Sequence, residues 1–397
     1  MLVPPVHATE KQNDCPIVLV HGFTGWGRDE MAGYLYWGGL GDIEADLNRH
    51  GYKTFTAAVG PFSSNWDRAC ELYAFIKGGT VDYGAAHAAK YGHARFGRTY
   101  PGIYPQWGEA DPVTGKVNKI HLVGHSMGGQ TIRMLIQLLE NGSPEEMAAT
   151  SPDQISPLFT GGKRWVLSAT SVSTPHDGTT LADIVTGLIP CAQQIISMAA
   201  AAAGLGSEPI YDFKMDQWGL KRLPGESFAS YANRVLSSPV WEDTKDISVW
   251  DLCPDGAKEL NSWVKAAPDV YYFSIGTECT HKGLLTGHQE PNITMNPLFH
   301  LFAHQMGSYT RNDPYKVPID RSWWKNDGVV NTVSMDGPKL GSSDTVKSYD
   351  GTPTPGVWQH LGTASNLDHM QIIGHYNVLP VYDRFRSLAA LLSSLPN

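Results

Sequence analysis

The sequence predicts an α/β fold in which helices cover both faces of a mainly parallel sheet. Apolar, β-branched runs bounded by Gly, Pro or Asn alternate with helical patterns along the chain, which is typical of such a sheet. The helical patterns include residues 41–51 and 382–395, where apolar residues recur at helical spacing. The expected strands lie at residues 16–23, 52–60, 119–124, 164–172, 270–276 and 328–335.

The size and composition fit one large domain with insertions. The chain has 397 residues, of which 42% are hydrophobic and 17% charged, so it can bury a sizeable core. We expect a single domain over residues 15–397, with insertions at about 61–118 and 177–262. Residues 1–14 are expected to be an N-terminal tail. Its "VHA" resembles a signal cleavage site, which favours a leader remnant and a secreted, extracellular protein.

The charge distribution argues against a nucleic-acid partner, and the length of the apolar runs argues against a transmembrane segment. The chain has 30 basic and 39 acidic residues, a net charge of −9, and it contains no basic block. Nucleic acid is therefore not an expected partner. No uninterrupted apolar run reaches the ~20 residues that a membrane-spanning helix needs, so no transmembrane segment is predicted.

A serine lies between a strand pattern and a helix pattern. The stretch "KIHLVGHSMGGQTIRMLIQLLENG" holds Ser126 within G-x-S-x-G, with an apolar run before it and helical spacing after it. In this context the motif turns the chain sharply and exposes the hydroxyl at the end of the strand. A Gly-rich connection with an incidental serine is the alternative, which the flanking strand and helix disfavour. Ser126 is therefore the predicted nucleophile.

A nucleophilic serine needs a histidine base and an acid that orients it. With this motif the expected chain order is serine, acid, histidine. We choose Asp327 as the acid because it adjoins the apolar run 328–335, and His369 as the base because it precedes a short apolar run. By position alone His360 and His375 remain open. The other aspartates in this part of the chain lie in longer polar loops: Asp313, Asp320, Asp336, Asp344 and Asp350.

The remaining candidates are oxyanion donors and metal ligands. Met127 follows the nucleophile, and Phe23 ends the first strong strand in "VHGFTG", so their N–H groups are the expected donors to an oxyanion. A plain turn is the alternative at "HG". His87 and His93 lie six residues apart, and with carboxylates they could form a tetrahedral zinc site. Spacing alone favours ordinary histidines, since no compact ligand signature is present.

Several long segments together resemble the thermoalkalophilic bacterial lipases of the Geobacillus type, with the staphylococcal lipases as nearest cousins. They include "PIVLVHGFTGWGRDEM", "TPHDGTTL", "YDFKMDQWGLKRLPGESF" and "NDGVVNTVSM". The resemblance runs from about Cys15 to the C-terminus. It implies an α/β-hydrolase fold, secretion, and hydrolysis of acylglycerol esters by a Ser-Asp-His acyl-enzyme mechanism. It also implies a helical lid that opens at lipid–water interfaces.

Carried over by position, the family's triad falls on Ser126, Asp327 and His369, and its oxyanion donors fall on Phe23 and Met127. The triad agrees with the residues chosen from the pattern alone. The resemblance also implies a structural zinc ion. Its four ligands fall on Asp67, His87, His93 and Asp246, where Asp246 is favoured over Asp243 because of a one-residue length difference. Four protein ligands would close the tetrahedron and leave no position for a reactive water.

The family's calcium site is expected to be absent here. Gln371 and Tyr376 stand where the family has two carboxylates, while Thr294 and Asn377 occupy the positions of the carbonyl donors. Because calcium affinity depends strongly on the number of anionic oxygens, two missing carboxylates should remove most of the binding. A neutral Gln371 could instead bond to neighbouring backbone and hold the His369 loop.

The lid is expected within roughly residues 180–215, which offer an apolar face interrupted by Gly187, Pro190 and Gly204. A permanently buried helix pair is the alternative. The expected substrate is an acylglycerol or another lipid ester at a lipid–water interface. Two other functions stay open: a carboxylesterase for short soluble esters, and a lipid-binding relative without turnover, against which the complete triad argues.

Overall fold

A seven-stranded sheet forms the centre of the computed structural model, which describes residues 10–184, 192–193, 196, 211–376 and 379–397. The strand order is β10-β11-β7-β6-β5-β1-β2, and every neighbouring pair is parallel. The strands are β1 (Ile17–Val20), β2 (Thr54–Ala57), β5 (Ile120–His125), β6 (Val166–Val172), β7 (Tyr271–Glu278), β10 (Val346–Ser348) and β11 (Trp358–Ser365). The predicted mainly parallel sheet is confirmed.

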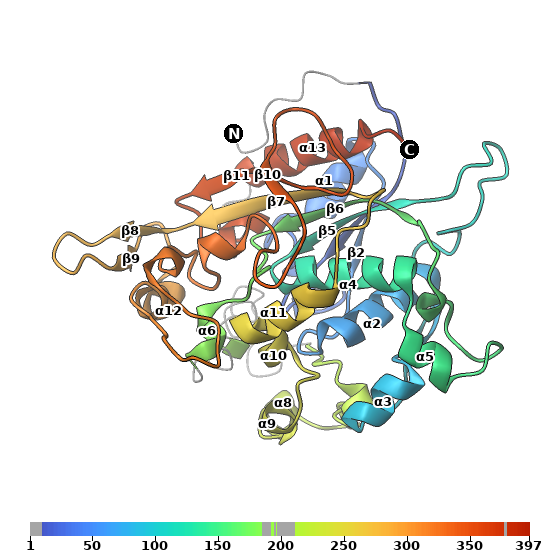
Figure 1. Cartoon of the computed structure of the whole chain (residues 1–397), viewed down its shortest axis with the longest axis horizontal. Helices are drawn as coiled ribbons and strands as arrows, with labels where there is room; N and C mark the ends of the chain where they lie inside the picture. Colours follow the sequence, from blue (N-terminus) through green and yellow to red (C-terminus); the bar gives the residue numbers. More distant parts are fainter. Residues whose placement is uncertain (1–9, 185–191, 194–195, 197–210, 377–378) are drawn as a thin grey trace.

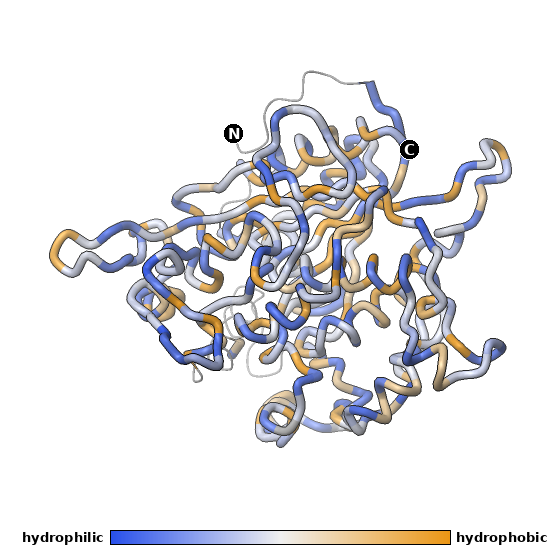
Figure 2. Tube along the Cα trace, viewed as in Figure 1, coloured by the Kyte–Doolittle hydropathy of each residue, from blue (hydrophilic) through white to orange (hydrophobic). Residues whose placement is uncertain are grey.

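Helices pack on both faces of this sheet, as predicted (Figure 1). On one face lie α1 (Ile43–Arg49) and α13 (Leu379–Ser393), which contact each other. On the other face lie α2 (Asn65–Lys77), α4 (Met127–Asn141) and α11 (Pro254–Trp263). Each face has its own buried apolar cluster, and Figure 2 shows hydrophobic residues along the central strands between them. The apolar residues of α4 that recur at helical spacing are all buried: Ile132, Leu135, Ile136 and Leu139.

The predicted strand at 328–335 is wrong. This stretch forms turns and a short 3₁₀ helix, Thr332–Ser334. The Asp327 carboxylate accepts hydrogen bonds from the N–H groups of Val329 and Val330, so the backbone finds local partners instead of a strand neighbour. The sheet is completed by β10 and β11, which the sequence pattern did not predict.

The first insertion and the later one lie beside each other near α2. The first contains β3 (Gly79–Asp82), α3 (Ala85–Tyr91) and β4 (Phe96–Tyr100), and the later one contains α6 (Thr180–Asp183), α8 (Phe228–Leu236), α9 (Val240–Asp243) and α10 (Ser248–Leu252). Most of the predicted lid, 180–215, lies outside the described residues. None of the helices in the described parts of the chain combines the length and apolar character of a membrane span.

The remaining elements are short. They are α5 (Pro144–Ala149), α12 (His300–Met306), the hairpin strands β8 (Thr280–Lys282) and β9 (Gln289–Pro291), and the 3₁₀ helices Met31–Gly33, Pro157–Thr160, Asp216–Trp218, Pro297–Phe299, Arg321–Trp323 and Gln371–Ile373. Before the first strand, the Asn13 side chain is buried and donates hydrogen bonds to the carbonyls of Leu392 and Leu395. The boundary expected between residues 14 and 15 stays a prediction.

Candidate active site and metal cluster

Ser126 lies at the turn between β5 and α4 in a backbone conformation that non-glycine residues seldom adopt. Its φ is 56° and its ψ is −134°. The turn requires close packing: a Cβ on Gly22 would lie 2.5 Å from the Ser126 Cβ, and one on Gly128 would lie 2.3 Å from the Val20 carbonyl oxygen. The structure therefore has the sharp strand–turn–helix that the G-x-S-x-G pattern predicts, pressed against the end of β1.

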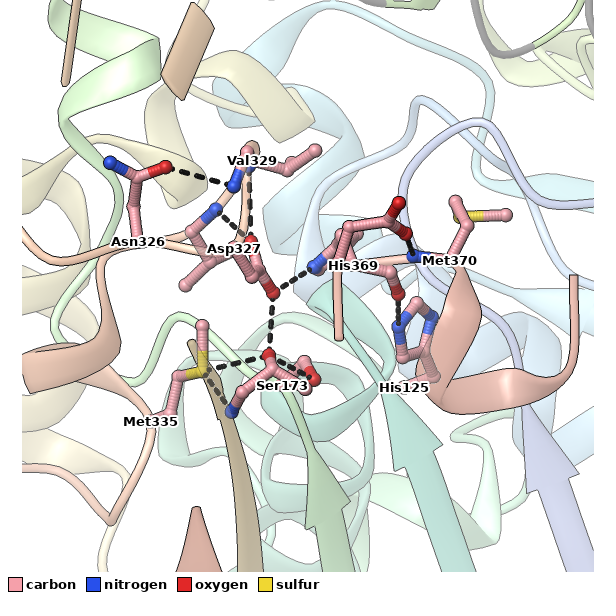
Figure 3. A network of polar contacts seen from close by, with 12 residues as sticks. His125, Ser173, Asn326, Asp327, Val329, Met335, His369 and Met370 are labelled. Atoms are coloured by element: carbon pink, nitrogen blue, oxygen red, sulfur yellow. Dashed lines mark hydrogen bonds and ion pairs between the residues drawn. The ribbon is translucent and has the colours of Figure 1, made fainter. Parts of the chain in front are cut away.

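Asp327 and His369 form a buried pair beside this turn (Figure 3). The His369 Nδ1 and the Asp327 Oδ2 are 2.8 Å apart, and the His369 N–H also donates to the Asp327 carbonyl at 3.1 Å. A carboxylate oxygen only accepts, so the His369 Nδ1 carries the proton and its Nε2 is left as the basic nitrogen. The Asp327 side chain is fully buried, and His369 is 2% exposed.

Protein donors saturate the Asp327 carboxylate. Its Oδ1 accepts from the backbone of Val329 at 3.0 Å and of Val330 at 2.8 Å, and its Oδ2 accepts from the Thr277 hydroxyl at 2.7 Å. Thr277 lies near the end of β7, so the sheet itself fixes the acid.

The two other candidate histidines lie elsewhere. His360 contacts the Ser274 hydroxyl through its Nδ1 at 3.0 Å. His375 is fully buried, with its Nδ1 2.9 Å from the Tyr34 hydroxyl, and burial lowers the pKa of its imidazole to about 4. Among the described residues, His369 alone of these three pairs with Asp327.

The predicted oxyanion donors belong to two segments next to the turn. Phe23 follows β1, and Met127 is the first residue of α4, where N–H groups have no partner within the helix. In the described part of the chain the Phe23 N–H has no hydrogen-bond acceptor. Ser126 and His369 lie in adjoining segments, yet no hydrogen bond joins the Ser126 hydroxyl to His369 within the described residues. Such bonds are often long before substrate binds.

Two residues that the sequence analysis did not single out connect these segments. The Gly22 N–H donates to the Tyr36 hydroxyl at 3.0 Å, and that hydroxyl lies 2.6 Å from the His125 Nδ1. The His125 Nε2 donates to the His369 carbonyl at 2.9 Å (Figure 3). Tyr36 and His125 therefore link the loop of Phe23 to the loop of His369. The sequence carries no local signal for this, because the partners lie far apart along the chain.

The four predicted zinc ligands do converge. Asp67, His87, His93 and Asp246 each offer one ligand atom, and these atoms all lie within 4.8 Å of one another. The nitrogen Nε2 of His87 and that of His93 are each 3.1 Å from the Asp246 Oδ2. All four ligand atoms are buried without a hydrogen-bond partner. Orphaned acceptors at this spacing fit a tetrahedral metal ion, and Asp246 is the aspartate of the later insertion in this group.

Neighbouring groups orient these ligands. The Gln217 amide donates to the Asp67 Oδ2 at 2.8 Å, the oxygen that faces away from the cluster, and the His93 Nδ1 donates to the Ala94 carbonyl at 2.9 Å. The His87 ring stacks on Trp66, with centroids 4.8 Å apart and planes 7° apart. Outer hydrogen bonds of this kind fix the tautomer and direction of metal-binding side chains.

At the family's calcium position, Gln371 bonds to backbone. Its Nε2 donates to the Thr294 carbonyl at 2.8 Å, and its Oε1 accepts from the Asp368 N–H at 3.0 Å. These are the contacts expected of a neutral side chain that holds the His369 loop. Tyr376 is half exposed, and Asn377 lies outside the described residues. The absence of calcium stays a prediction.

Two solved structures share this architecture over nearly the whole chain. EstA from Clostridium botulinum superposes with a TM-score of 0.92 at 51% identity, covering 99% of this chain and 90% of that one. Lipase 1 from Pelosinus fermentans superposes with a TM-score of 0.90 at 52% identity, covering 97% of this chain and 100% of that one. Together with the observed sheet, these confirm the α/β-hydrolase fold of lipases.

Sequence comparisons also relate the chain to lipases. The chain is 39% identical over 373 residues to Lipase 1 of Staphylococcus aureus (strain MRSA252), a match that covers 91% of this chain and 51% of that protein. The chain thus spans about half the length of the curated relatives it matches. The model of the family described as "Lipase-like, C-terminal domain" matches residues 13–389. The resemblance drawn from the sequence is confirmed: the chain belongs to this family of lipase-like proteins.

Proposed function

We propose that this protein is a secreted lipase that hydrolyses ester bonds of acylglycerols through an acyl-enzyme on Ser126. The observation that carries the proposal is the buried Asp327–His369 pair, 2.8 Å apart, beside the strained turn of Ser126. The lipase names of similar proteins support the substrate class. The resemblance to a family of secreted lipases supports secretion.

Each residue has a defined role in this mechanism. The His369 Nε2 removes the proton of the Ser126 hydroxyl, whose oxygen attacks the ester carbonyl. The N–H groups of Phe23 and Met127 donate to the oxygen that becomes negatively charged. His369 then gives its proton to the departing glyceride oxygen and activates a water, which attacks the acyl-enzyme and frees the fatty acid. Asp327 keeps the proton on Nδ1 and stabilises the imidazolium.

The metal in this proposal is a structural Zn²⁺ held by Asp67, His87, His93 and Asp246. Its charge would offset two buried carboxylates, and no reaction step passes through it.

The proposal includes a helical lid within 180–215 that opens at a lipid interface. Such a lid would cover the acyl pocket in water and expose its apolar side to lipid.

Comparing Ser126→Ala with the parent on three substrates tests this function. The substrates are a soluble short-chain ester, tributyrin and a triolein emulsion. A lipase should hydrolyse all three, a carboxylesterase only the first or the first two, and a lipid-binding protein none. Ser126→Ala should lose nearly all turnover because no other side chain supplies a nucleophile at the turn. Ser274→Ala is the matched control, a buried serine of the same sheet away from the Asp327–His369 pair. Substantial activity of Ser126→Ala would refute the mechanism.

A further inference from the structure

The β8–β9 hairpin carries two leucines that no described part of the chain covers. Leu284 and Leu285 at its tip are 102% and 101% exposed. The hairpin projects from the molecule, and its tip is hydrophobic (Figures 1 and 2). Single exposed apolar residues are common, but two adjacent and fully exposed leucines on a projecting tip leave apolar area available to another apolar phase.

The hairpin does not need these leucines to close. Its turn is held by the Gly283 N–H, which donates to the His288 carbonyl at 2.8 Å, and by the Thr286 hydroxyl, which donates to the Glu290 carboxylate at 2.8 Å. The antiparallel pairing of β8 with β9 holds the two arms together. The leucine side chains are therefore free for a role outside the fold.

The first arm of the hairpin is joined to the Asp327 loop. β8 starts two residues after the carboxyl end of β7, the sheet edge at which Ser126 also lies. The Cys279 N–H donates to the Asn326 carbonyl at 2.9 Å, and the Asn326 N–H donates to the Thr280 hydroxyl at 3.3 Å. Asn326 immediately precedes the proposed acid.

The second arm is joined to the His369 loop. The Asn292 amide donates to the Asn366 side-chain oxygen at 2.8 Å, and the Asn296 N–H donates to the Asp368 carboxylate at 2.9 Å. Asp368 immediately precedes His369. The hairpin tip is thus held in a fixed place relative to the loops of both the acid and the base.

We propose that the hairpin tip docks the protein on a lipid surface, with Leu284 and Leu285 inserted among the acyl chains. This inference rests on the proposed lipase function and names how the site is brought to an aggregated substrate. Two further exposed apolar side chains follow β9 along the chain. They are Ile293 at 97% and Leu301, on α12, at 61%. Docking through this hairpin turns the carboxyl edge of the sheet, where Ser126 and His369 lie, towards the lipid.

A lipid surface fits these residues better than a second copy of the chain. Stable protein interfaces bury about 800 Å² per partner, far more than two leucine side chains can supply. Insertion into acyl chains needs no complementary pocket, and its strength scales with the apolar area that leaves water. A few side chains at the end of a rigid hairpin therefore suffice.

The test compares Leu284→Ser/Leu285→Ser with Val113→Ser, a matched control that removes another exposed apolar side chain. Val113 is 89% exposed in the loop before the amino end of β5, at the opposite edge of the sheet (Figure 1). Sedimentation with phosphatidylcholine vesicles containing triolein measures binding, with Ser126→Ala also present so that no lipid is consumed. The hairpin variant should bind at least about ten-fold more weakly than the parent, since two leucines no longer leave water.

With Ser126 restored, the hairpin variant should lose triolein hydrolysis by a similar factor but keep its kcat/KM on a soluble short-chain ester and its melting temperature. Val113→Ser should match the parent in every assay. Equal vesicle binding by the two variants would overturn the inference. It would also be overturned if the parent did not bind vesicles, or if the hairpin variant lost only self-association. A parent that binds through the hairpin but hydrolyses no ester would refute the proposed function and leave the docking intact.

Discussion

Tyr36 and His125 have fixed hydrogen-bond directions because both are buried. Burial raises the pKa of the Tyr36 hydroxyl, so it keeps its proton, and burial lowers the pKa of the His125 imidazole well below its usual range, so the ring stays neutral. The His125 Nε2 donates to a carbonyl, hence its Nδ1 accepts from Tyr36. The Tyr36 oxygen then accepts from the Gly22 N–H. A chain of hydrogen bonds between uncharged groups therefore connects the loop of Gly22 to the loop of His369.

Tyr36→Phe should therefore lower kcat by about ten-fold, which is about 1.4 kcal/mol in activation free energy, with little change in KM. The ring and its packing remain, but the Gly22 N–H and the His125 Nδ1 lose their partner, and the Phe23 donor next to Gly22 is held less firmly. Kinetics on a soluble ester measure the effect. Tyr34→Phe is the control, since its hydroxyl contacts His375 instead. Equal kcat values for the two variants would contradict this positioning role.

The residues that could be predicted from sequence are those with a local pattern. Ser126 has a motif around it, and the position after a motif or strand identifies Met127 and Phe23. Position alone left His369 among three histidines, because the choice depends on the three-dimensional contact with Asp327. Thr277, which donates to that aspartate, has no signal at all, since it is 50 residues away along the chain.

At the scale of elements, the strands that were missed lack the pattern of a buried strand. β11 reads Trp-Gln-His-Leu-Gly-Thr-Ala-Ser, in which polar residues and a glycine interrupt the apolar run. It forms because β7 offers a long parallel partner, and Gln359 is fully buried despite being polar. Conversely, the β-branched run after Asp327 pairs with no strand in the described part of the chain. Tertiary context decides both cases.

The metal cluster joins three elements of the two insertions. Asp67 comes from α2, His87 from α3, His93 from the second residue after α3, and Asp246 from the turn between α9 and α10. Chelation should lower the melting temperature by about 5–10 °C, because two buried carboxylates would face each other without a cation. Differential scanning calorimetry with and without chelator measures the shift, and elemental analysis identifies the ion.

His93→Ala should lower the melting temperature in the same way and abolish the response to chelator. The exposed His281→Ala is its control, since this side chain lies on β8, outside the cluster. Activity on a soluble ester should survive the first minutes of chelation, as the Asp327–His369 pair includes no metal ligand. Purified protein without zinc under chelator-free conditions would refute the assignment of the ion.

The loop after β11 should not respond to calcium. The Thr294 carbonyl already accepts a hydrogen bond from Gln371, and Gln371 brings an amide where the family has a carboxylate. Adding calcium to calcium-stripped protein should change neither activity nor melting temperature, whereas Gln371→Ala should lower the melting temperature by removing both backbone contacts. Calorimetric titration checks this. The prediction would be wrong if micromolar calcium stabilised the protein and if substitutions in residues 368–377 abolished that stabilisation.

For the whole molecule, two sets of buried groups respond to acid in opposite directions. Burial lowers the pKa of five fully buried histidines, so the unfolded chain binds their protons first and acid favours unfolding; they are His21, His121, His125, His176 and His375. Burial raises the pKa of several carboxyl groups to about 6 or 7, so these groups favour the folded chain as the pH falls towards 4.5; they are Glu71, Glu140, Asp177 and Asp251. The two effects partly cancel between about pH 6.5 and 4.5. Below this range the opposing effect of these carboxyl groups ends while the histidine effect continues, so stability should fall more steeply.

A single substitution isolates the histidine effect. His121 is buried on β5, where its Nδ1 contacts the Ser168 hydroxyl and its Nε2 contacts Asn13, and burial lowers its pKa to about 3. Its usual pKa is about 6.5, so from pH 6.5 to 4.5 the unfolded state gains a proton that the folded state does not bind. At about 1.4 kcal/mol per pH unit, the parent loses roughly 2–3 kcal/mol of unfolding free energy from this group.

His121→Asn should be less stable than the parent at pH 7.5, because it loses ring packing, but it should lack this loss in acid. The difference in unfolding free energy between variant and parent should therefore shift by roughly 2–3 kcal/mol in favour of the variant between pH 7.5 and 4.5. Urea unfolding at pH 7.5, 5.5 and 4.5 measures it, with the exposed His304→Asn as control. All other titrating groups are common to both proteins, so their opposing effects cancel in the difference. If the two curves run parallel across this range, the imidazole of His121 is not held neutral by burial.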